Sequence, residues 1–488
     1  MSSQTRTETD SIGSLEIPAS AYWGVHTARA HENFPIARRP ISVYPDFIRA
    51  FACVKQAAAR ANLEIGALDE QRATLIDRAC EEIKTGMLHD QFVVGVVQGG
   101  AGTSTNMNAN EVITNRALEL AGHAKGDYTF INPNDHTNRS QSTNDTYPTA
   151  IKVALAFSLT TLLEELELLA ASFEAKGREF SHILKVGRTQ LQDAVPMTLG
   201  QEFNAFGVTL REDVDRLREA VSLLGEVNMG ATAIGTGINA PKGYKEAVIR
   251  HLREITELNL VTSSDLVEST MDTGVFITFS GALKRSAMKL SKISNDLRLL
   301  SSGPQAGIGE INLPARQAGS SIMPGKVNPV IPEAVSQVAY AVAGSDVTVA
   351  MAVEAGQLQL NAFEPIIAHS LFQSILWLER ACQTLRVNCV DGITANEERL
   401  EDMVSRSVTV ITALAPVIGY ATAAKLAKEA LATNAKVVDL VTSQGLLDHD
   451  ELERILQPSK LAGLAPETDA IPIVEADAAF EEDDATEA

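Results

Sequence analysis

The chain has 488 residues, of which 45% are hydrophobic and 21% are charged, and its formal net charge is −21. This composition is ordinary for a soluble globular protein, and the length allows two to four domains. The negative charge argues against partners such as nucleic acid or an anionic membrane, although local cations could still hold an anionic substrate in a cleft. Aromatic residues make up only 5%, whereas Ala and Leu are abundant, which favours packed helices over sheets.

The cysteines and histidines predict neither a disulfide nor a metal site. No CxxC pair occurs, and on one helix Cys382 and Cys389 would lie roughly 10 Å apart along the axis, too far for a disulfide. The nine histidines form neither HExxH nor a cluster at ligand spacing. Because Met1–Asp10 is polar and lacks an apolar signal core, we expect a cytoplasmic protein with buried free thiols.

The first predicted domain, residues 1–142, is mixed but mostly helical. Within it, a helical pattern from Met107 to Leu120 follows the polar stretch Gly102–Asn106. Hydroxyl side chains at the start of a helix cap free backbone N–H groups, and the same geometry binds a carboxylate. Capping explains this stretch at least as well when it is taken alone. A phosphate loop is excluded because no Gly-Lys-Ser/Thr follows.

Long amphipathic helices dominate the predicted central domain, residues 143–396. In Ile151–Lys176, apolar residues recur at a 4-3-4-3-4 spacing and form one stripe on a helix roughly 39 Å long. Leu290–Leu300 repeats the pattern, and Val335–Val353 is almost wholly apolar, although Gly344–Asp346 interrupts it and argues against a membrane span. Such helices need partners, so a long bundle with oligomerisation is expected. The first stripe consists of Leu155, Leu159, Leu162, Leu166, Leu169 and Phe173.

Shorter helices are predicted for a small C-terminal domain, residues 397–466. The remaining segment, 467–488, is predicted to be a disordered, solvated tail. Its last part, Glu475–Ala488, carries seven acidic residues and no basic one.

One polar stretch of the central domain, Gly187–Pro196, precedes a further helical run. Its Arg188 and Asp193 could pair with each other. Thr189 and Gln190 have no obvious structural task, which makes them candidates for a binding site.

Two other stretches place polar groups before helices. Gln141–Asp145 precedes the first long helix, which Asp145 could cap, yet four consecutive polar donors and acceptors exceed what a cap needs. Gly319–Pro329 combines glycines and prolines with two serines, Lys326 and Asn328. Such a loop is equipped to hold an anion and to move a proton, although a plain connector between helices is the alternative.

Other kinds of catalytic machinery are missing from the sequence. It contains neither the nucleophile elbow GxSxG nor the dinucleotide motif GxGxxG. What remains are three stretches rich in Thr, Ser and Asn and one loop with Ser, Lys and Asn. Groups of this kind bind carboxylates and stabilise a developing oxyanion.

Together the four stretches resemble the signature regions of the aspartase/fumarase superfamily. GSSIMPGKVNP at 319–329 resembles its signature loop, and GTSTNMN, QSTND and GRTQLQDAVP resemble its companion regions. The resemblance covers residues 10–465. It implies a mainly α-helical fold of three domains, whose long central bundles combine in a tetramer into one multi-helix core. It also implies active sites that are shared by three subunits of the homotetramer.

Positions that vary within the family favour its ammonia-lyases over its class II fumarases. Fumarases usually carry HPND-D-VN where this chain has Asn132–Asn138, and His where it has Gln190. The segment Glu354–Asn361 also resembles the ammonia-lyase version of a site that is typically NFELN in fumarases. The resemblance therefore implies reversible deamination of L-aspartate to fumarate and ammonia. A class II fumarase and a non-catalytic protein on the same scaffold are the alternatives.

The resemblance also implies roles for single residues. Ser320 is the expected general base, on a mobile loop, which removes the Cβ proton and yields an aci-carboxylate intermediate. No cofactor or metal site is expected, although activation by a divalent cation stays open. The expected substrate-binding residues are Thr103, Ser142, Thr143 and Ser321 for the β-carboxylate, Lys326 and Asn328 for the α-carboxylate, and Asn144, Thr189 and Gln190 for the amino group.

Overall fold

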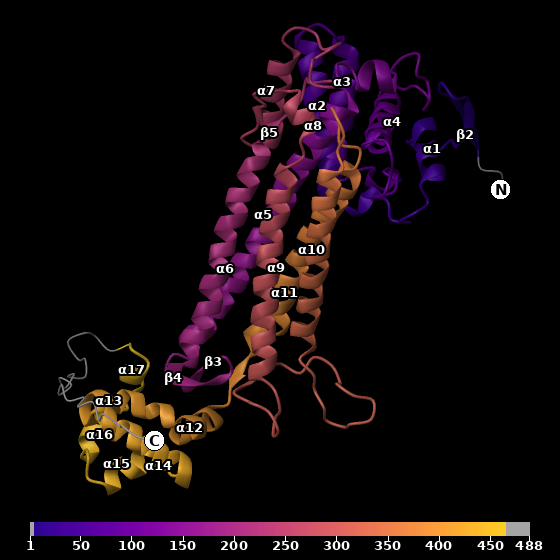
Figure 1. Cartoon of the computed structure of the whole chain (residues 1–488). Coiled ribbons are helices and arrows are strands. Elements are labelled where there is room, and N and C mark those ends of the chain that lie inside the picture. The colour runs from indigo at the N-terminus through magenta and orange to yellow at the C-terminus, as the bar shows by residue number, and fades with distance from the viewer. Residues whose placement is uncertain (1–3, 465–488) are drawn as a thin grey trace, which may run out of the picture. The chain divides into compact units, whose positions relative to one another are not determined.

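The structure is a computed structural model that describes residues 4–464, so the predicted tail lies outside the described residues. Helices make up most of this part, as predicted (Figure 1). The helices are α1 (Val25–Asn33), α2 (Pro45–Glu64), α3 (Glu70–Lys84), α4 (Thr103–Leu120), α5 (Thr143–Glu179), α6 (Leu199–Ser222), α7 (Tyr244–Thr256), α8 (Glu268–Met271), α9 (Val275–Leu300), α10 (Val330–Glu354), α11 (Glu364–Asn388), α12 (Glu397–Arg406), α13 (Ile411–Ile418), α14 (Tyr420–Thr433), α15 (Val437–Ser443), α16 (His449–Ile455) and α17 (Pro458–Leu461).

The strands of residues 4–464 form four sheets of two strands each. Three pairs are antiparallel, and β5–β6 is parallel. The pairs are β1 (Thr5–Thr9) with β2 (Ser14–Pro18), β3 (Leu184–Thr189) with β4 (Gln192–Thr198), β5 (Glu226–Val227) with β6 (Val261–Thr262), and β7 (Ile311–Asn312) with β8 (Thr394–Ala395).

The contacts divide the chain into two compact units, and the boundaries fall within the long helices α5, α6, α9, α10 and α11. Unit 1 comprises Met1–Glu167, Arg211–Ser291 and Ala334–Gln383, and unit 2 comprises Leu168–Leu210, Lys292–Glu333 and Thr384–Ala488. The predicted three-domain boundaries stay a prediction.

Unit 1 holds segments of the long helices side by side, with α2, α3, α4 and α7 at one end (Figure 1). Polar contacts join neighbouring helices: Ser280 on α9 donates to Asp346 on α10 at 2.8 Å, and Arg285 on α9 pairs with Asp213 on α6 at 2.8 Å. All six residues of the predicted α5 stripe are at most 1% exposed, four of them in unit 1. The 4-3-4 spacing therefore identified the buried face of this helix.

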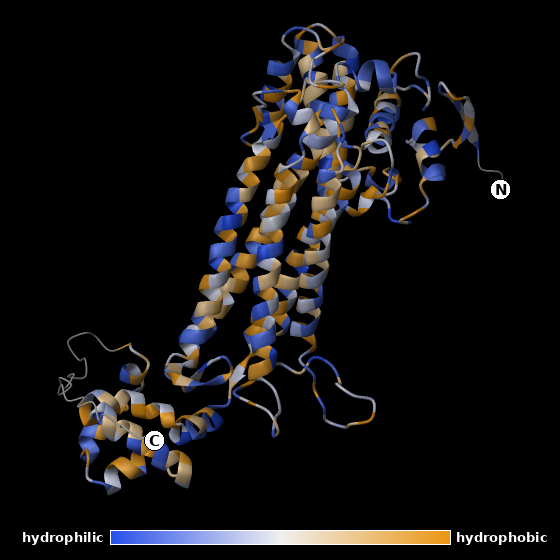
Figure 2. Cartoon of the chain, in the orientation of Figure 1, coloured by the Kyte–Doolittle hydropathy of each residue, from blue (hydrophilic) through white to orange (hydrophobic). Residues whose placement is uncertain are grey.

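Figure 2 shows polar and apolar residues mixed along the long helices. Within residues 4–464, no helix combines the length and the apolar character that crossing a membrane requires. All four cysteines are buried and free.

Unit 2 contains the β3–β4 hairpin, which interrupts the stretch predicted to be mostly helical. The two-residue turn at Gln190 and Leu191 has φ values of +52° and +63°. Positive φ at both central residues is the geometry of a type I′ hairpin turn. The local sequence does not predict this turn, because a type I′ turn favours Asn-Gly and the chain has Gln-Leu.

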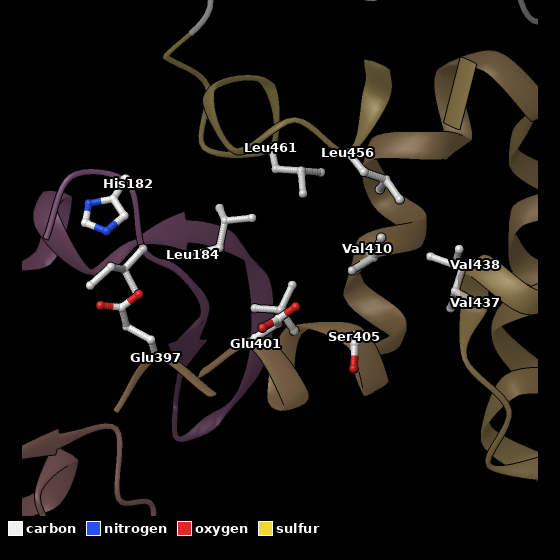
Figure 3. A pocket seen from close by; sticks show the side chains of 12 residues that line it. His182, Leu184, Glu397, Glu401, Ser405, Val410, Val437, Val438, Leu456 and Leu461 are labelled. Atoms are coloured by element: carbon white, nitrogen blue, oxygen red, sulfur yellow. The ribbon is translucent and has the colours of Figure 1, made fainter. Parts of the chain in front are cut away.

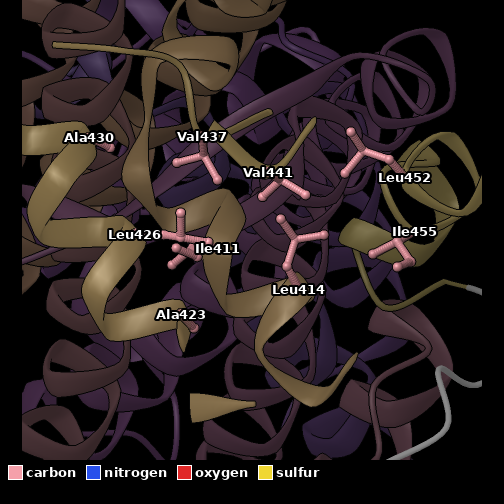
Figure 4. Close-up of a cluster of buried hydrophobic side chains, with 9 residues drawn as sticks. All are labelled: Ile411, Leu414, Ala423, Leu426, Ala430, Val437, Val441, Leu452 and Ile455. Carbon is pink, nitrogen blue, oxygen red and sulfur yellow. The ribbon is translucent and has the colours of Figure 1, made fainter. Parts of the chain in front are cut away.

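The C-terminal helices of unit 2 enclose a small core of their own (Figure 4). Leu414 and Val441 are fully buried at its centre, and Leu426 and Ile455 are at most 2% exposed. α13, α14, α15 and α16 supply these residues, as the prediction of short C-terminal helices required.

Replacing Leu414 by Ala should therefore destabilise these helices by about 2–5 kcal/mol, since a buried leucine leaves a cavity when it is truncated. Hydrogen exchange of the backbone amides in α13–α16 measures the effect. Tyr420→Ala is the matched control, because Tyr420 is 85% exposed on α14. Equal protection in both variants would contradict the assignment of this core.

Candidate active site

The N-terminal ends of α4 and α5 meet in unit 1. Gly102 precedes α4 with a φ of +90°, and a Cβ there would lie 2.3 Å from the ring of Tyr147 on α5. Glycine alone fits this close approach. Asn106 Nδ2 on α4 donates to Thr143 Oγ1 on α5 at 3.0 Å. The structure thus brings Thr103, the first residue of α4, close to Thr143, the first residue of α5.

Ser142 and Asp145 cap α5. Ser142 Oγ accepts from the Asn144 N–H at 3.2 Å, while Asp145 Oδ1 accepts from the Ser142 N–H at 3.0 Å. Ser142 thus caps a first-turn N–H, and Asp145 reaches back to the N–H of Ser142, so the capping interpretation of Asp145 is correct. Asn144 Nδ2 donates to the carbonyl oxygen of Ala233 at 2.7 Å. Ser142, Thr143 and Asn144 remain partly exposed beside these contacts.

Lys55 on α2 is buried beneath the partly exposed start of α5, and the sequence analysis did not identify it. Its side chain is fully buried, and its Nζ donates to Asn138 Oδ1 and to Gln141 Oε1, each at 2.9 Å. Asn138 Oδ1 also accepts from Asn106 Nδ2 at 3.2 Å, and Asn106 contacts Thr143. Lys55 is therefore connected to Thr143 through two amides. A lysine within an apolar, alanine-rich helical segment was the available signal.

Burial sets the protonation of the charged groups in this network. It lowers the pKa of Lys55 to about 7, and the negative charge of Asp145 only partly opposes this. Burial also raises the pKa of Asp145 to about 6, while the Ser142 and Thr232 N–H groups that it accepts from, and the charge of Lys55, pull it down. Both groups therefore titrate much closer to neutral pH than exposed Lys and Asp side chains do.

A polar cavity of about 460 Å³ borders Ser142 in unit 1. Its volume suits a small ligand. Asn132, one of the positions that favoured ammonia-lyases, caps the single π-turn Pro133–Thr137 whose residues contribute to the lining. The lining residues are Asn134, Asp135, Asn138, Arg139, Ser140, Gln141, Ser142, Thr232, Ala233, Ile238 and Asn239.

Backbone contacts close the 319–329 loop of unit 2 at its base. The Gly319 N–H donates to the Lys326 carbonyl oxygen at 2.7 Å, and Asn328 Nδ2 donates to the Gly319 carbonyl oxygen at 2.8 Å. A Cβ on Gly319 would lie 2.7 Å from the Lys326 oxygen, so this closure requires glycine. Asn328 holds the loop together, while Ser321 and Lys326 are exposed on it.

Two backbone donors point at the predicted base. Ser320 Oγ accepts from the Ile322 N–H at 3.2 Å and from the Met323 N–H at 3.0 Å. Hydrogen bonds to the charged form of a group lower its pKa, so these donors favour a serine alkoxide. This is the kind of stabilisation that a serine needs before it can act as a base.

The hairpin places Thr189 and Gln190 at an exposed turn of unit 2. Arg188, next to them, faces Asp193 in the β3–β4 ladder but pairs with Glu310 at 2.5 Å. The alternative of an Arg188–Asp193 pair is therefore not realised. Glu310 itself was missed, because nothing in the local sequence indicates its partner 122 residues away.

A second cavity, of about 390 Å³, lies in unit 2 where α12, α15 and the segments around α16 and α17 face the start of the hairpin (Figure 3). Its walls are mostly apolar, with Leu184, Val410 and Leu456 among them. It contains none of the predicted site residues. Within residues 4–464, no group of three His, Cys, Asp or Glu side chains could hold a metal ion.

Two family descriptions match the chain. "Lyase" matches residues 13–344, and "Fumarase C C-terminus" matches residues 410–463. The chain is 56% identical to the aspartate ammonia-lyase of Pseudomonas fluorescens over 457 residues, which cover 93% of this chain and 96% of that protein. It is 52% identical to the aspartate ammonia-lyase of Escherichia coli K12 over 462 residues, which cover 94% and 97%.

Solved structures agree with this match. A structure described as fumarate lyase:delta crystallin from Brucella melitensis, bound to cobalt, superposes with a TM-score of 0.92 at 55% identity and covers 95% of this chain and 100% of its own. The class II fumarase of Schistosoma mansoni superposes with a TM-score of 0.88 at 33% identity and covers 94% and 99%. The chain belongs to this lyase family, the aspartase/fumarase superfamily, as its sequence predicted. The predicted mainly helical fold is likewise confirmed.

Lys55 should leave a signature in the pH dependence of stability. Between about pH 7 and about pH 10 the unfolded chain binds a proton at this lysine that the folded chain does not, so the free energy of unfolding rises with pH. We expect the melting temperature of the wild type, relative to Lys55→Met, to increase over this range. The exposed Lys425 gives the control variant Lys425→Met. A constant difference between wild type and Lys55→Met would contradict the lowered pKa.

Proposed function

We propose that the chain is a carbon–nitrogen lyase that deaminates L-aspartate reversibly to fumarate and ammonia. The observation that carries this function is the 56% identity, over 93% of the chain, to an aspartate ammonia-lyase, against 33% to the class II fumarase of known structure. The predicted activity is supported in this way, and the fumarase alternative is not favoured. A non-catalytic protein is disfavoured because all four polar stretches keep their chemical groups.

The reaction requires help at a weakly acidic C–H bond. Ser320 takes the proton from Cβ of aspartate, and the bonding electrons move onto the β-carboxylate to give a doubly charged aci-carboxylate. The aci-carboxylate then collapses: its electron pair forms the Cα–Cβ double bond of fumarate, the C–N bond breaks, and ammonia leaves with the bonding pair. The N–H groups of Ile322 and Met323 support Ser320 in this role, since they stabilise the alkoxide.

Different groups hold the two ends of the substrate. Thr103, Ser142 and Thr143 at the helix ends, together with Ser321 of the loop, bind the β-carboxylate and stabilise its extra charge. The partial positive charge at the starts of α4 and α5 favours an anion at this place.

The α-carboxylate and the amino group are held by the remaining residues. Lys326 supplies the positive charge for the α-carboxylate, and Asn328, whose amide also donates to the Gly319 carbonyl oxygen, contacts the same carboxylate. Asn144, Thr189 and Gln190 contact the amino group. No organic cofactor takes part, and a divalent cation acts, if at all, as an activator. The cytoplasmic location stays a prediction.

The active form is a homotetramer in which three chains contribute to each site. An exposed apolar stripe on α10 supports this assembly: Tyr340, Val347 and Met351 are 60%, 58% and 69% exposed, with Gly344 between them. Their 4-3-4 spacing is that of a seam between helices. The exposure of Thr189, Gln190 and the 319–329 loop on a single chain fits a site that other chains complete.

Ser320→Ala should lower kcat by roughly 10³-fold, because it removes the general base without changing the bulk of the loop. The ultraviolet absorbance of fumarate, formed from L-aspartate and separately from malate, measures both this effect and the choice of substrate. Ser443→Ala, at an exposed serine on α15, is the control. Near-normal turnover in Ser320→Ala would exclude the base assignment, and faster turnover of malate would restore the fumarase alternative.

Light scattering tests the assembly. We expect a mass close to four chains of 52.3 kDa. Val347→Glu should dissociate the tetramer and abolish activity, since it places a charge in the α10 seam. Leu431→Glu, at a position on α14 that is 70% exposed, should leave the mass unchanged. A fully active monomer would contradict the shared sites.

A further inference from the structure

Glu310 is buried at a junction of unit 2. Its side chain is 0% exposed. Its backbone is fixed on both sides, because its N–H donates to the Leu300 carbonyl oxygen at 2.8 Å and its carbonyl oxygen accepts from the Asn396 N–H at 2.9 Å. Glu310 immediately precedes β7, from which the chain continues into the loop with Ser320. The residue is thus anchored at the base of the segment that carries the proposed base.

Two cations of strand β3 converge on the Glu310 carboxylate. Arg188 Nη1 lies 2.5 Å from Oε1, and Lys185 Nζ lies 2.7 Å from Oε2. Lys185, whose side chain is 2% exposed, also pairs with Glu202 on α6 at 2.6 Å. The cluster contains two positive and two negative groups, so its charge is balanced. Removal of one member leaves an unpaired charge in a place that water hardly reaches.

A β-bulge in the hairpin lies between the two cations. Lys185 and Arg188 are three residues apart, so in a regular strand their side chains would point to opposite faces. The β3–β4 register shifts between Val186 and Arg188. The extra residue is on β4, where three steps from Pro196 to Asp193 match two steps from Val186 to Arg188. Such a bulge increases the local twist of the hairpin between the two cations, and both of them reach one carboxylate. Gly187 lies opposite the bulge, where a Cβ would lie 2.8 Å from the Val195 carbonyl oxygen.

The ion pair fixes the position of the hairpin turn. Arg188 is bonded directly to Thr189, and the two-residue turn at Gln190 follows at once. The turn itself is exposed, and Leu191 is 70% exposed. In unit 2, the Arg188–Glu310 contact therefore links the turn to the segment that leads into the Ser320 loop.

We propose that Glu310 is a positioning residue for the deamination: through Arg188 it holds the hairpin turn in place, so that Thr189 and Gln190 reach the substrate in a site that other chains complete. This inference rests on the proposed contact of Thr189 and Gln190 with the substrate amino group. Glu310 touches no substrate. Loss of Glu310 weakens binding of the substrate amino group, because the hairpin turn contacts that group.

Glu310→Gln tests the proposal, since it keeps the size of the side chain and removes its charge. We expect KM for L-aspartate to rise by roughly tenfold or more, as a displaced positioning group requires. The inhibition constant of succinate, a dicarboxylate without an amino group, should change much less. Arg188→Gln should reproduce this selective effect, and the double variant should be no worse than either single one.

Glu202→Gln is the matched control. It removes the other partner of Lys185 and leaves the Arg188–Glu310 pair intact, so it should lower the melting temperature without changing the ratio of KM for aspartate to the succinate constant. If Glu310→Gln does not assemble, Arg188→Gln carries the test, because Arg188 is 19% exposed and tolerates substitution better.

The outcomes separate the positioning role from the proposed function. The measured quantity is the ratio of KM for aspartate to the inhibition constant of succinate. If this ratio rises in Gln190→Ala but stays unchanged in Glu310→Gln and Arg188→Gln, the positioning role is overturned and the proposed function stands. An unchanged ratio in Gln190→Ala overturns the assignment to the amino group and the positioning role with it. If Glu310→Gln weakens the binding of aspartate and of succinate equally, the cluster has only a structural role, and the proposal is also overturned.

Discussion

The proposed substrate is a dicarboxylate, which needs groups that supply hydrogen bonds and positive charge, and the proposed site takes them from the starts of helices. α4 begins at Thr103 and α5 at Thr143, and the 319–329 loop leads directly into α10. The first turn of a helix leaves backbone N–H groups without partners and carries a partial positive charge. Long helices that pack side by side bring such ends to defined places, which explains why residues distant in sequence serve one chemistry.

Rigid backbone contacts surround the polar ends. Gly102 lets α4 approach Tyr147, and Gly319 lets the loop close on its own carbonyl group. Buried charge adds a second level of order: Lys55 supports Thr143 from behind, and Glu310 ties the hairpin to the loop segment. The exposed polar side chains of the helix ends, the loop and the hairpin turn are thus held in position by buried, hydrogen-bonded groups.

Residue patterns within one helix were readable from the sequence, whereas partnerships between distant segments were not. The α5 stripe was predicted by its spacing, and the signature loop identified the family. The sequence did not identify Lys55 and Glu310, because their contacts are with residues 83 and 122 positions away. The β3–β4 hairpin escaped because its turn uses Gln190 and Leu191 in a backbone conformation that normally requires Gly or Asn.

A crystal structure of Ser320→Ala with L-aspartate bound tests the shared active site directly, since loss of the proposed base should slow turnover and leave substrate binding intact. We expect one aspartate whose β-carboxylate contacts Thr103 and Thr143 and whose α-carboxylate contacts Lys326, with these residues drawn from different chains. The methyl group that replaces the Ser320 hydroxymethyl group should face Cβ of the bound aspartate. Aspartate held by residues of one chain alone, or bound away from the 319–329 loop, would contradict the shared active site.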